Sequence, residues 1–372
     1  MKIVHFIHHD GEGGGPYSVR KQMAFYSLFH VVHVVHGGSG RIADLCEEVG
    51  IAHTRLDVET VTDTILNLPL LVFLFRTLKP DLLILHGQWA GSLGSLAGIT
   101  ARVPKMLYIA HWPAFYTDWD LKRIVRNWIS EWLPCRLCDS VITLSRMSHN
   151  SYLQQFPWIR DKIHLLSNSI EDGETPSRRQ IETIQKLHQW TPDKTQIVSV
   201  GRLVDQKRLE WLLDAWAECS EIWDRAHLWI IGEGSERQNL EEKAHKLGIE
   251  DSCSFLGAKP RGIEYIGASD IVVFTSLYEA FGNVALEAML CGKPIIASRV
   301  AGIESTIEDG KQGFLVLPGD KSELKARILQ LVPDRNLRER MGSSGRERVR
   351  KYKASMVIPR YLEIVNQLFK QS

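Results

Sequence analysis

The sequence alternates short runs of Val, Ile and Leu with longer stretches of helical periodicity. Runs such as "KIVHFIH" (2–8) and "QIVSVGR" (196–202) are rich in apolar residues on both faces, as in strands that are buried on both sides. Strands that alternate with helices are typical of stacked βαβ units, in which parallel strands form a sheet covered by helices. The pattern therefore predicts an α/β fold built on parallel sheets.

About six strands are expected in each half of the chain. In the first half they are expected at 2–8, 30–36, 81–86, 105–111, 139–145 and 163–169. In the second half they are expected at 196–202, 227–234, 253–257, 270–276, 293–298 and 313–316. Each half could thus close its own core.

The length of 372 residues exceeds what one hydrophobic core usually supports, so two domains are expected. The segment 171–195 has Gly, Pro and charge at both ends and no strand pattern, which places the boundary near residue 170. The composition, with 44% hydrophobic and 24% charged residues and a net charge of +1, is that of an ordinary globular protein. We therefore expect no nucleic-acid partner, and any polyanion must be bound by a local site.

The expected location is the cytoplasm. The first residues lack a signal-peptide cleavage site, and the longest apolar stretch, 65–75, is too short to span a membrane and contains Pro69. Six scattered cysteines fit free thiols in a reducing compartment.

Four strand ends carry candidate ligand-binding residues, because open parallel sheets bind ligands at the carboxyl ends of their strands. The first is "HHDGEGGGPYSVRKQM" (8–23), in which Gly14 and Gly15 would let the backbone approach a ligand closely. Pro16 stands where a dinucleotide-binding pattern has its third glycine. A flexible turn is the alternative.

The second strand end, "VGRLVDQKRLEWLLDAW" (200–216), places Arg202 and Lys207 where they would converge on a diphosphate. The alternative is a pair of solvated surface charges. The third, "WIIGEGSERQNLEEKA" (229–244), has Gly232 and Gly234 before Ser235, which we interpret as a helix N-cap. An ordinary βα loop is the alternative there.

The fourth is "TSLYEAFGNVALEAMLCGKP" (275–294), which follows a buried strand. Glu279 is expected in the loop above the strand end, and Glu287 one turn into a helix that begins near Asn283. The turn formed by Gly282, Asn283 and Val284 would offer backbone N–H groups to an anion.

Together with "GIESTIEDGKQGFLV", the second, third and fourth segments, in this order, resemble the nucleotide-sugar half of glycosyltransferase family 4. The resemblance covers nearly all of 196–330, and in the first half it is carried by the glycine loop, "AHWP" and "VITLS". It implies a GT-B fold, with two Rossmann-like parallel-sheet domains facing a central cleft. It also implies an acceptor-binding domain at 1–170, a nucleotide-sugar-binding domain at 171–352 and a last helix, 353–372, that packs back on the first domain.

Carried over to this sequence, the resemblance implies that Arg202 and Lys207 hold the donor diphosphate and that Glu287 receives hydrogen bonds from the ribose. Glu279 would lie beside the transferred sugar, and His111 of "AHWP" would touch the sugar near its reacting carbon. Backbone N–H groups of the four residues Phe281, Gly282, Asn283 and Val284 would contact sugar or phosphate oxygens.

The expected activity is that of a retaining hexosyltransferase that moves a sugar from a nucleotide diphosphate, such as UDP, to a glycan, lipid-linked or small-molecule acceptor in polysaccharide biosynthesis. Retention is an implication of the resemblance. We expect no cofactor and no metal, because Arg202, Lys207 and a helix N-terminus can stabilise the departing diphosphate, and no Asp-x-Asp motif stands at the end of a predicted strand. A two-carboxylate glycosidase is disfavoured, because Glu279 and Glu287 are assigned to different parts of the donor.

Two rivals stay open: a nucleotide-sugar epimerase or phosphorylase of the same fold, and a non-catalytic GT-B-like partner protein. The amphipathic stretch "WDLKRIVRNWISEWL" (119–133) could rest on an anionic membrane, but we expect it to bury its apolar side on the sheet. Peripheral contact of the first domain with the inner face of a membrane is the alternative location. The sequence names neither the donor sugar nor the acceptor.

Overall fold

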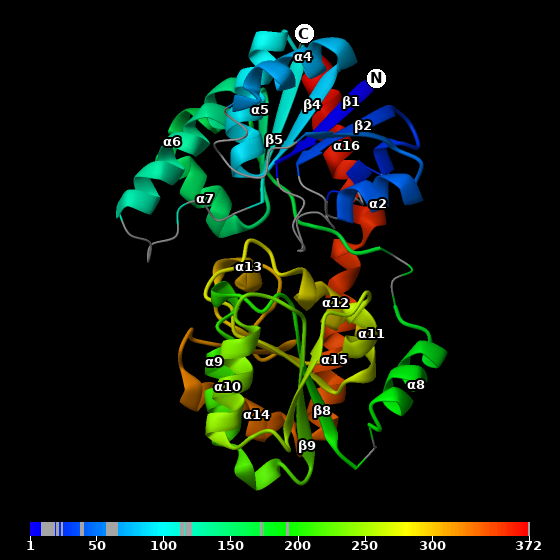
Figure 1. Ribbon diagram of the computed structural model, residues 1–372, viewed down its shortest axis with the longest axis vertical. Coiled ribbons are helices and arrows are strands. Elements are labelled where there is room, and N and C mark those ends of the chain that lie inside the picture. Colours follow the sequence, from blue (N-terminus) through cyan, green and yellow to red (C-terminus); the bar gives the residue numbers. More distant parts are fainter. Residues whose placement is uncertain are drawn as a thin grey trace. The chain divides into compact units, whose positions relative to one another are not determined.

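The computed structural model describes residues 1–8, 19, 22, 23, 25–37, 41–56, 66–111, 115, 121–171, 173, 175–190 and 193–370. It divides into two compact units (Figure 1). The N-terminal unit comprises Met1–Ser169 and Ala354–Ser372, and the C-terminal unit is Ile170–Lys353. The chain therefore passes between the units twice.

The N-terminal unit is built on a parallel sheet of seven strands in the order β3-β2-β1-β4-β5-β6-β7. The strands are β1 (Lys2–Ile7), β2 (Val31–Gly37), β3 (Ala52–Leu56), β4 (Leu82–His86), β5 (Lys105–Ala110), β6 (Ser140–Thr143) and β7 (Ile163–Leu165). The six strands predicted for this half are confirmed, and β3 was missed. β3 is a sheet edge in which Leu56 alone is buried, so its sequence, "AHTRL", lacks the apolar run of a central strand.

Helices follow the strands of this unit as a βαβ chain requires. They are α2 (Arg41–Glu48), α4 (Leu68–Leu78), α5 (Gln88–Ala101), α6 (Leu121–Leu137), α7 (Arg146–Gln155) and the short η1 (Pro157–Ile159). The last helix of the chain, α16 (Ala354–Lys370), belongs to this unit and buries an apolar face that includes Tyr361 and Val365.

The C-terminal unit has a parallel sheet of six strands in the order β10-β9-β8-β11-β12-β13, as predicted in number. The strands are β8 (Thr195–Val200), β9 (Ala226–Ile231), β10 (Cys253–Gly257), β11 (Ile271–Phe274), β12 (Ile295–Ser298) and β13 (Gly313–Val316). The helices are α8 (Arg178–Leu187), α9 (Leu209–Ala217), α10 (Arg237–Leu247), α11 (Gly262–Ala268), α12 (Asn283–Cys291), α13 (Ala301–Glu304), α14 (Lys321–Leu331) and α15 (Arg335–Val349). Short 3-10 turns are η2 (Asp205–Lys207), η3 (Ser220–Ile222) and η4 (Arg350–Tyr352).

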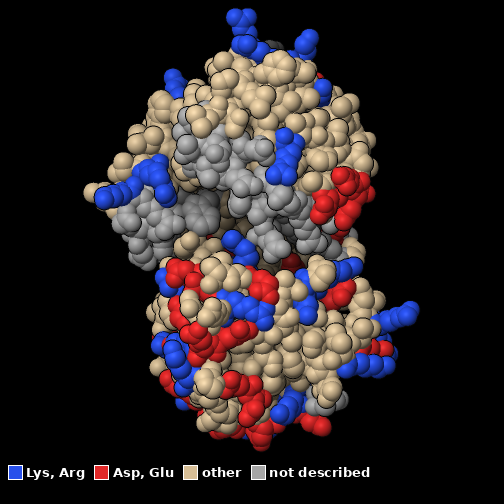
Figure 2. All heavy atoms as spheres, viewed as in Figure 1, with Lys and Arg blue, Asp and Glu red and all other residues tan. Residues whose placement is uncertain are grey.

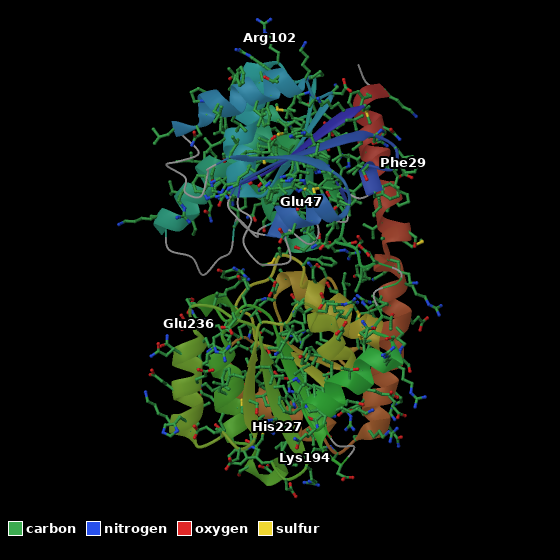
Figure 3. All side chains as sticks on the ribbon, turned by 45° about the vertical axis from the view of Figure 1, so that its right-hand side comes forward. Phe29, Glu47, Arg102, Lys194, His227 and Glu236 are labelled. Atoms are coloured by element: carbon green, nitrogen blue, oxygen red, sulfur yellow. The ribbon has the colours of Figure 1, made fainter. Side chains whose placement is uncertain are left out.

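The central strands β8 and β11 are neighbours in this sheet, although β9, β10 and several helices lie between them in the sequence. The strand order reverses between them, and in open α/β sheets such a position is where ligands bind. In Figure 3, the labelled His227 and Lys194 mark the amino ends of the strands of the C-terminal sheet. The labelled Glu236 lies toward the carboxyl ends, where a ligand is expected.

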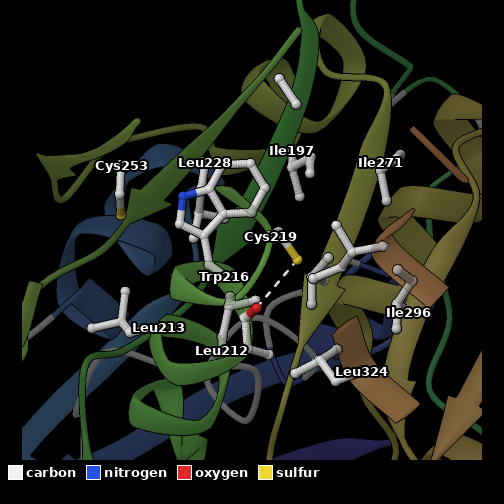
Figure 4. Close-up of a cluster of buried hydrophobic side chains, with 14 of the residues drawn as sticks. Ile197, Leu212, Leu213, Trp216, Cys219, Leu228, Cys253, Ile271, Ile296 and Leu324 are labelled. Carbon is white, nitrogen blue, oxygen red and sulfur yellow. Dashed lines mark hydrogen bonds between the residues drawn. The ribbon is translucent and has the colours of Figure 1, made fainter. Parts of the chain in front are cut away.

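Each unit has its own hydrophobic core. In the C-terminal unit, Trp216 is fully buried among aliphatic side chains of β8, β9 and β11 (Figure 4). Its indole N–H donates to Ser252 Oγ at 3.0 Å, so the one polar atom of this side chain is satisfied.

The six cysteines are free and buried, as the sequence predicted, and Cys135 and Cys138 are two of them. Within the described part of the chain, no helix combines the length and the apolar character needed to cross a membrane.

Candidate functional site

A small pocket lies at the carboxyl ends of β8 and β11 in the C-terminal unit. Its walls are formed by Ser199, Val200, Gly201, Arg202, Lys207, Leu209, Phe274 and Thr275. The sequence predicted that Arg202 and Lys207 would converge, and both line this pocket. Arg202 is exposed and has no ion pair with any residue that the structure describes, so its charge is available to a ligand.

Lys207 forms an ion pair with Glu279, the acid that the sequence placed in the loop after β11. The Nζ of Lys207 donates to Oε1 of Glu279, and Ser276 Oγ donates to the same oxygen at 2.8 Å. Both charged side chains are largely shielded, with 20% of the Lys207 side chain and 14% of the Glu279 side chain exposed. Two donors at one carboxylate oxygen therefore fix the orientation of Glu279.

The loops after β8 and β11 are joined by further hydrogen bonds. Gln206 Nε2 donates to the carbonyl of Tyr278 at 2.9 Å, and the N–H of Leu277 donates to the carbonyl of Gln206 at 2.8 Å. Thr275 Oγ1 donates to the carbonyl of Lys207 at 3.0 Å. The sequence analysis missed Gln206, Thr275 and Ser276, although their position at two strand ends could have drawn attention to them.

Gly232 and Gly234, predicted as ligand-contacting glycines, are packed against the loop after β8. A Cβ on Gly232 would lie 1.8 Å from the carbonyl oxygen of Gly201, and one on Gly234 would lie 2.2 Å from that of Leu203. Both have positive φ, of 148° and 158°. Their small size is therefore required by the approach of two loops, and contact with a ligand stays a prediction.

The N-cap prediction for Ser235 was wrong. Helix α10 begins at Arg237, its N-cap residue is Glu236, and no side chain forms the capping hydrogen bond.

Helix α12 begins at Asn283, as the sequence predicted. Its N-cap residue is Gly282 in the left-handed region, with φ of 82°, where glycine is favoured. The Phe281 side chain is buried and its ring contacts Tyr352 at a centroid distance of 5.7 Å, so Phe281 could meet a ligand only through its backbone. Val284 and Glu287 lie in the first turns of the helix and are half-buried.

Gly302 of α13 supports this turn, and the sequence analysis missed it. A Cβ on Gly302 would lie 2.4 Å from the carbonyl oxygen of Glu279 and 2.6 Å from the backbone nitrogen of Phe281. Thr306 Oγ1 donates to the carbonyl of Phe281 at 3.1 Å. The glycine in "RVAGIEST" had no local signal that could reveal this approach from a later part of the chain.

In the N-terminal unit, His111 follows β5 and is half-buried. Its Nε2 lies 3.1 Å from Nδ1 of His86, the last residue of β4. Burial lowers the pKa of His111 to about 4, so the imidazole is neutral at physiological pH. Gly14 and Gly15, the predicted glycines of the first loop, lie outside the described residues.

Helix α6 has its apolar side exposed, which contradicts the expectation that this side packs on the sheet. The exposed face carries Leu121, Val125, Trp128, Ile129 and Trp132. Their spacing places them on one side of the helix.

The opposite, buried face of α6 carries three polar side chains in addition to the core residue Cys135. Asn127, Ser130 and Glu131 are buried there. Gln88 Nε2 of α5 donates to Asn127 Oδ1 at 3.1 Å and to Ser130 Oγ at 2.6 Å. These hydrogen bonds compensate for burying polar groups, and they hold the helix with its aliphatic and Trp side chains facing outward.

The charged side chains that α6 exposes to solvent are basic. Lys122, Arg126 and Arg136 are exposed, and the one acidic residue of α6 is the buried Glu131. Figure 2 shows the visible face of the N-terminal unit as largely uncharged, whereas that of the C-terminal unit mixes acidic and basic atoms.

Among the described residues, no group of three or more His, Cys, Asp and Glu side chains is arranged to hold a metal ion.

Comparison with known proteins finds two family models that together match most of the chain. The model described as glycosyl transferases group 1 matches residues 180–348, and the model described as Glycosyltransferase Family 4 matches residues 27–174.

Among curated relatives, the chain is 28% identical over 233 residues to the lipopolysaccharide core biosynthesis glycosyltransferase LpsE of Rhizobium meliloti. That match covers 62% of this chain and 64% of LpsE. This chain is also 24% identical to the capsular polysaccharide biosynthesis glycosyltransferase CapM of Staphylococcus aureus, over 92% of this chain and 91% of CapM. The chain spans between about half and two thirds of the length of the first relatives, from 48% to 64%.

Among solved structures, Anabaena HepE in complex with UDP-glucose superposes with a TM-score of 0.88 at 22% identity, covering 99% of this chain and all of HepE (100%). At this level of identity the likeness shows the fold, which is two parallel-sheet α/β domains of the GT-B type.

Proposed function

Because this chain belongs to glycosyltransferase family 4 and has the GT-B fold, we propose that it transfers a sugar from a nucleotide diphosphate sugar to an acceptor. The observation that carries the proposal is the pocket at the ends of β8 and β11, where Arg202 and Lys207 meet and Lys207 holds Glu279. Two cations beside a shielded carboxylate suit a ligand with an anionic and a polyhydroxylated part.

The residues have separate roles in this proposal. Arg202, Lys207 and the N-terminus of α12, with the backbone of Phe281 to Val284, stabilise the diphosphate as it departs. Glu279 lies beside the transferred sugar, whose ring gains positive charge as the bond to phosphate breaks. Glu287 receives hydrogen bonds from the ribose hydroxyls.

UDP is the proposed donor nucleotide, because HepE was crystallised with UDP and UDP-glucose. LpsE and CapM are named for lipopolysaccharide core and capsular polysaccharide biosynthesis, which supports a glycan or lipid-linked acceptor in polysaccharide biosynthesis.

The first experiment is a thermal-shift screen of UDP, GDP and ADP and of their sugars against the full chain. Ligand at 100 times its dissociation constant adds about 2.7 kcal/mol to the free energy of unfolding, which raises the melting temperature measurably. Stabilisation by the UDP series is expected, and it should be lost in Arg202→Ala. If none of these nucleotides stabilises the protein, the proposal fails and a non-catalytic role is favoured.

We propose further that transfer occurs with retention of the anomeric configuration and without a divalent metal. The resemblance to the family supports retention, and the cations of the pocket support metal independence, because they would stabilise the leaving group in place of a metal ion. NMR of the product would establish the configuration. Activity that disappears with a chelator and returns with Mn²⁺ would refute metal independence.

Product analysis separates this activity from its rivals. A nucleotide-sugar donor incubated without acceptor would yield an epimerised donor if the protein were an epimerase. Formation of a sugar 1-phosphate from a glycan and inorganic phosphate would identify a phosphorylase. The proposed transferase gives neither product and requires an acceptor.

We also propose that α6 brings the protein to an anionic membrane surface, as a peripheral contact of the N-terminal unit on the cytoplasmic side. Exposed Trp side chains, neighbouring aliphatic residues and flanking cations are the composition of helices that lie in a bilayer interface. Such a contact would suit a lipid-linked acceptor.

Vesicle flotation tests this contact. The protein should float with vesicles that contain anionic lipid, less with neutral vesicles, and less again at high salt, which screens the cations. The double variant Ile129→Ser/Trp132→Ser should lose binding. A matched control, Leu187→Ser/Leu317→Ser, removes two exposed apolar residues of the C-terminal unit and should bind as the unchanged protein does. If the unchanged protein does not float with anionic vesicles, the proposed membrane contact is contradicted.

A further inference from the structure

Three histidines on adjacent strands of the N-terminal sheet form a continuous hydrogen-bonded chain. His5 lies in β1, His86 ends β4 and His111 follows β5. Nδ1 of His5 lies 2.9 Å from Nε2 of His86, and Nδ1 of His86 lies 3.1 Å from Nε2 of His111. The ring planes are inclined by 13° and 25°, so neighbouring rings are nearly parallel.

All three imidazoles are neutral at physiological pH. Burial lowers the pKa of His5 to about 3 and that of His111 to about 4, and it lowers the pKa of His86 well below 6.5, with a further contribution from its two histidine neighbours. A neutral imidazole has one N–H donor and one bare nitrogen acceptor. Both hydrogen bonds form only if the three rings point their N–H groups in the same direction along the chain.

The buried end of the chain selects the direction. Nε2 of His5 is buried and has no hydrogen-bond partner. If the N–H groups pointed toward His5, that atom would be a buried donor without an acceptor. If they point toward His111, it is a bare nitrogen, and the buried unpaired donor is avoided; unpaired buried N–H groups are the rarer of the two in proteins.

We infer that His5 and His86 are positioning residues that hold His111 as the Nδ1–H tautomer, so that His111 presents a neutral hydrogen-bond donor to its ligand. The inference rests on the proposed function, together with the family resemblance, which implies that His111 contacts the transferred sugar. His111 Nδ1 has no hydrogen-bond partner among the described residues, so this donor is available.

The chemistry of sugar transfer favours such a donor. The sugar ring gains positive charge as the bond to phosphate breaks, and an imidazolium beside it would oppose that charge. A neutral N–H can bind a sugar oxygen without this cost. In this arrangement His111 orients the sugar, and neither donates nor removes a proton in the reaction.

The tautomer can be observed directly by ¹⁵N NMR of the full chain labelled at histidine, without ligand and at pH 7. Ring ¹⁵N shifts distinguish a protonated nitrogen from a bare one, and the spectrum of His111→Gln identifies the His111 signals. We expect Nδ1 protonated and Nε2 bare. A bare Nδ1, or an imidazolium, overturns the inference whether or not the protein binds a donor.

Activity tests the consequence. In His86→Phe, His111 loses the partner that selects its tautomer, so kcat/KM should fall about 3- to 10-fold, the value of one hydrogen bond. The control is His227→Phe, which removes a half-buried histidine that is bonded to Ser254 and lies at the amino end of β9. His227→Phe should leave kcat/KM unchanged.

The two tests fail separately. Unchanged turnover in a folded His86→Phe protein overturns the positioning role. If His86→Phe does not fold, the NMR measurement on the unchanged protein still decides the tautomer. Absence of nucleotide stabilisation in the thermal-shift screen would count against the proposed function and would leave the NMR result as it stands.

Discussion

Glu279 is held in one orientation by two donors, Lys207 Nζ and Ser276 Oγ, at the same oxygen. Lys207 thus both lines the pocket and contacts the carboxylate. This places the group proposed to bind phosphate directly beside the group proposed to face the sugar, as the bond between those two parts of the donor requires.

Glu279→Ala is expected to reduce kcat about 100-fold, because it removes a charge that acts on the reacting sugar. Lys207→Ala and Glu287→Ala should chiefly raise the KM for the donor, by about 10- to 100-fold, since each removes a charged hydrogen bond to it. Steady-state kinetics with a UDP-sugar measures both constants.

A suitable control for these variants is Lys243→Ala. Lys243 also forms an ion pair, with Asp214 at 2.6 Å, but on α10 and α9. Its removal should change neither constant. Turnover of Glu279→Ala equal to that of the unchanged protein would contradict the assignment.

Glu131 gives the protein a pH-dependent stability. Burial raises its pKa from 4.5 to about 7, although Tyr108 Oη donates to it at 2.8 Å. Between these values the folded state retains a proton that the unfolded chain has lost, so stability falls as pH rises. At about 1.4 kcal/mol per pKa unit, this one group should lower the free energy of unfolding by about 3 kcal/mol between pH 4.5 and pH 8.

Urea denaturation of the unchanged protein and of Glu131→Gln, at pH 5 and at pH 8, checks this expectation. The variant cannot ionise at this position, so its stability relative to the unchanged protein should increase toward pH 8. Parallel pH dependence of the two proteins would show that Glu131 is not the source.

At the scale of elements, the candidate site is assembled by loops that approach one another closely. Because Gly232 and Gly234 have no side chain, the loop after β8 can pack closely against them. In the same way, Gly302 of α13 allows the close approach of the turn that contains Glu279. These contacts join segments that are distant in the sequence, so no local pattern predicted them. The strand ends themselves were predictable, because apolar runs and the loops after them are local features.

Gly302→Ala should reduce the turnover of a protein that stays folded. Its Cβ would meet the backbone of Glu279 at 2.4 Å, and backbone yields less easily than a flexible side chain. A displacement of about 1 Å can reduce turnover about 100-fold, whereas overpacking costs about 1–3 kcal/mol of stability. Kinetics and urea denaturation measure the two effects.

Gly345→Ala provides the comparison for Gly302→Ala. Gly345 is also in a helix, and its Cβ would lie 3.3 Å from Met289. This variant should retain nearly full turnover. Equal losses of turnover in the two variants would mean that Gly302 does not act through the Glu279 turn.

Helix α6 shows a limit of periodicity as a predictor. Its sequence has one apolar and one polar side, and both orientations satisfy that pattern. The half-buried Gln88 and the buried Ser92 on α5 decide the orientation, because they donate hydrogen bonds to Asn127 and Ser130. A helix that hides its polar groups in this way is recognisable only when its neighbour is known.

At the scale of the whole molecule, the division into two α/β units and nearly all strands could be predicted from the sequence. Central strands such as β8 and β11 have strong apolar runs, whereas the missed β3 is a polar edge. Of the site, the charged residues were predictable from strand ends. The histidine chain was not, because His5, His86 and His111 become neighbours only when three strands pair.

Deletion of residues 354–372 should destabilise the N-terminal unit selectively. The deletion removes α16, whose side chains Tyr361 and Val365 are buried. Hydrogen exchange should show lost protection in β1 and β4 and retained protection in β8 and β11. Met356→Ser, which changes an exposed residue of the same helix, should leave both sheets protected. Equal protection of the two sheets in the truncated protein would contradict this dependence.

The return of α16 to the first unit also sets an order of events on the ribosome. Residues 170–353 form a contiguous stretch and can complete their unit as soon as they have emerged. The N-terminal unit is translated first but is complete only after α16 has emerged. Until then, the surface of this unit that packs against α16 is exposed. A nascent chain that stops early should therefore engage chaperones through its amino-terminal half.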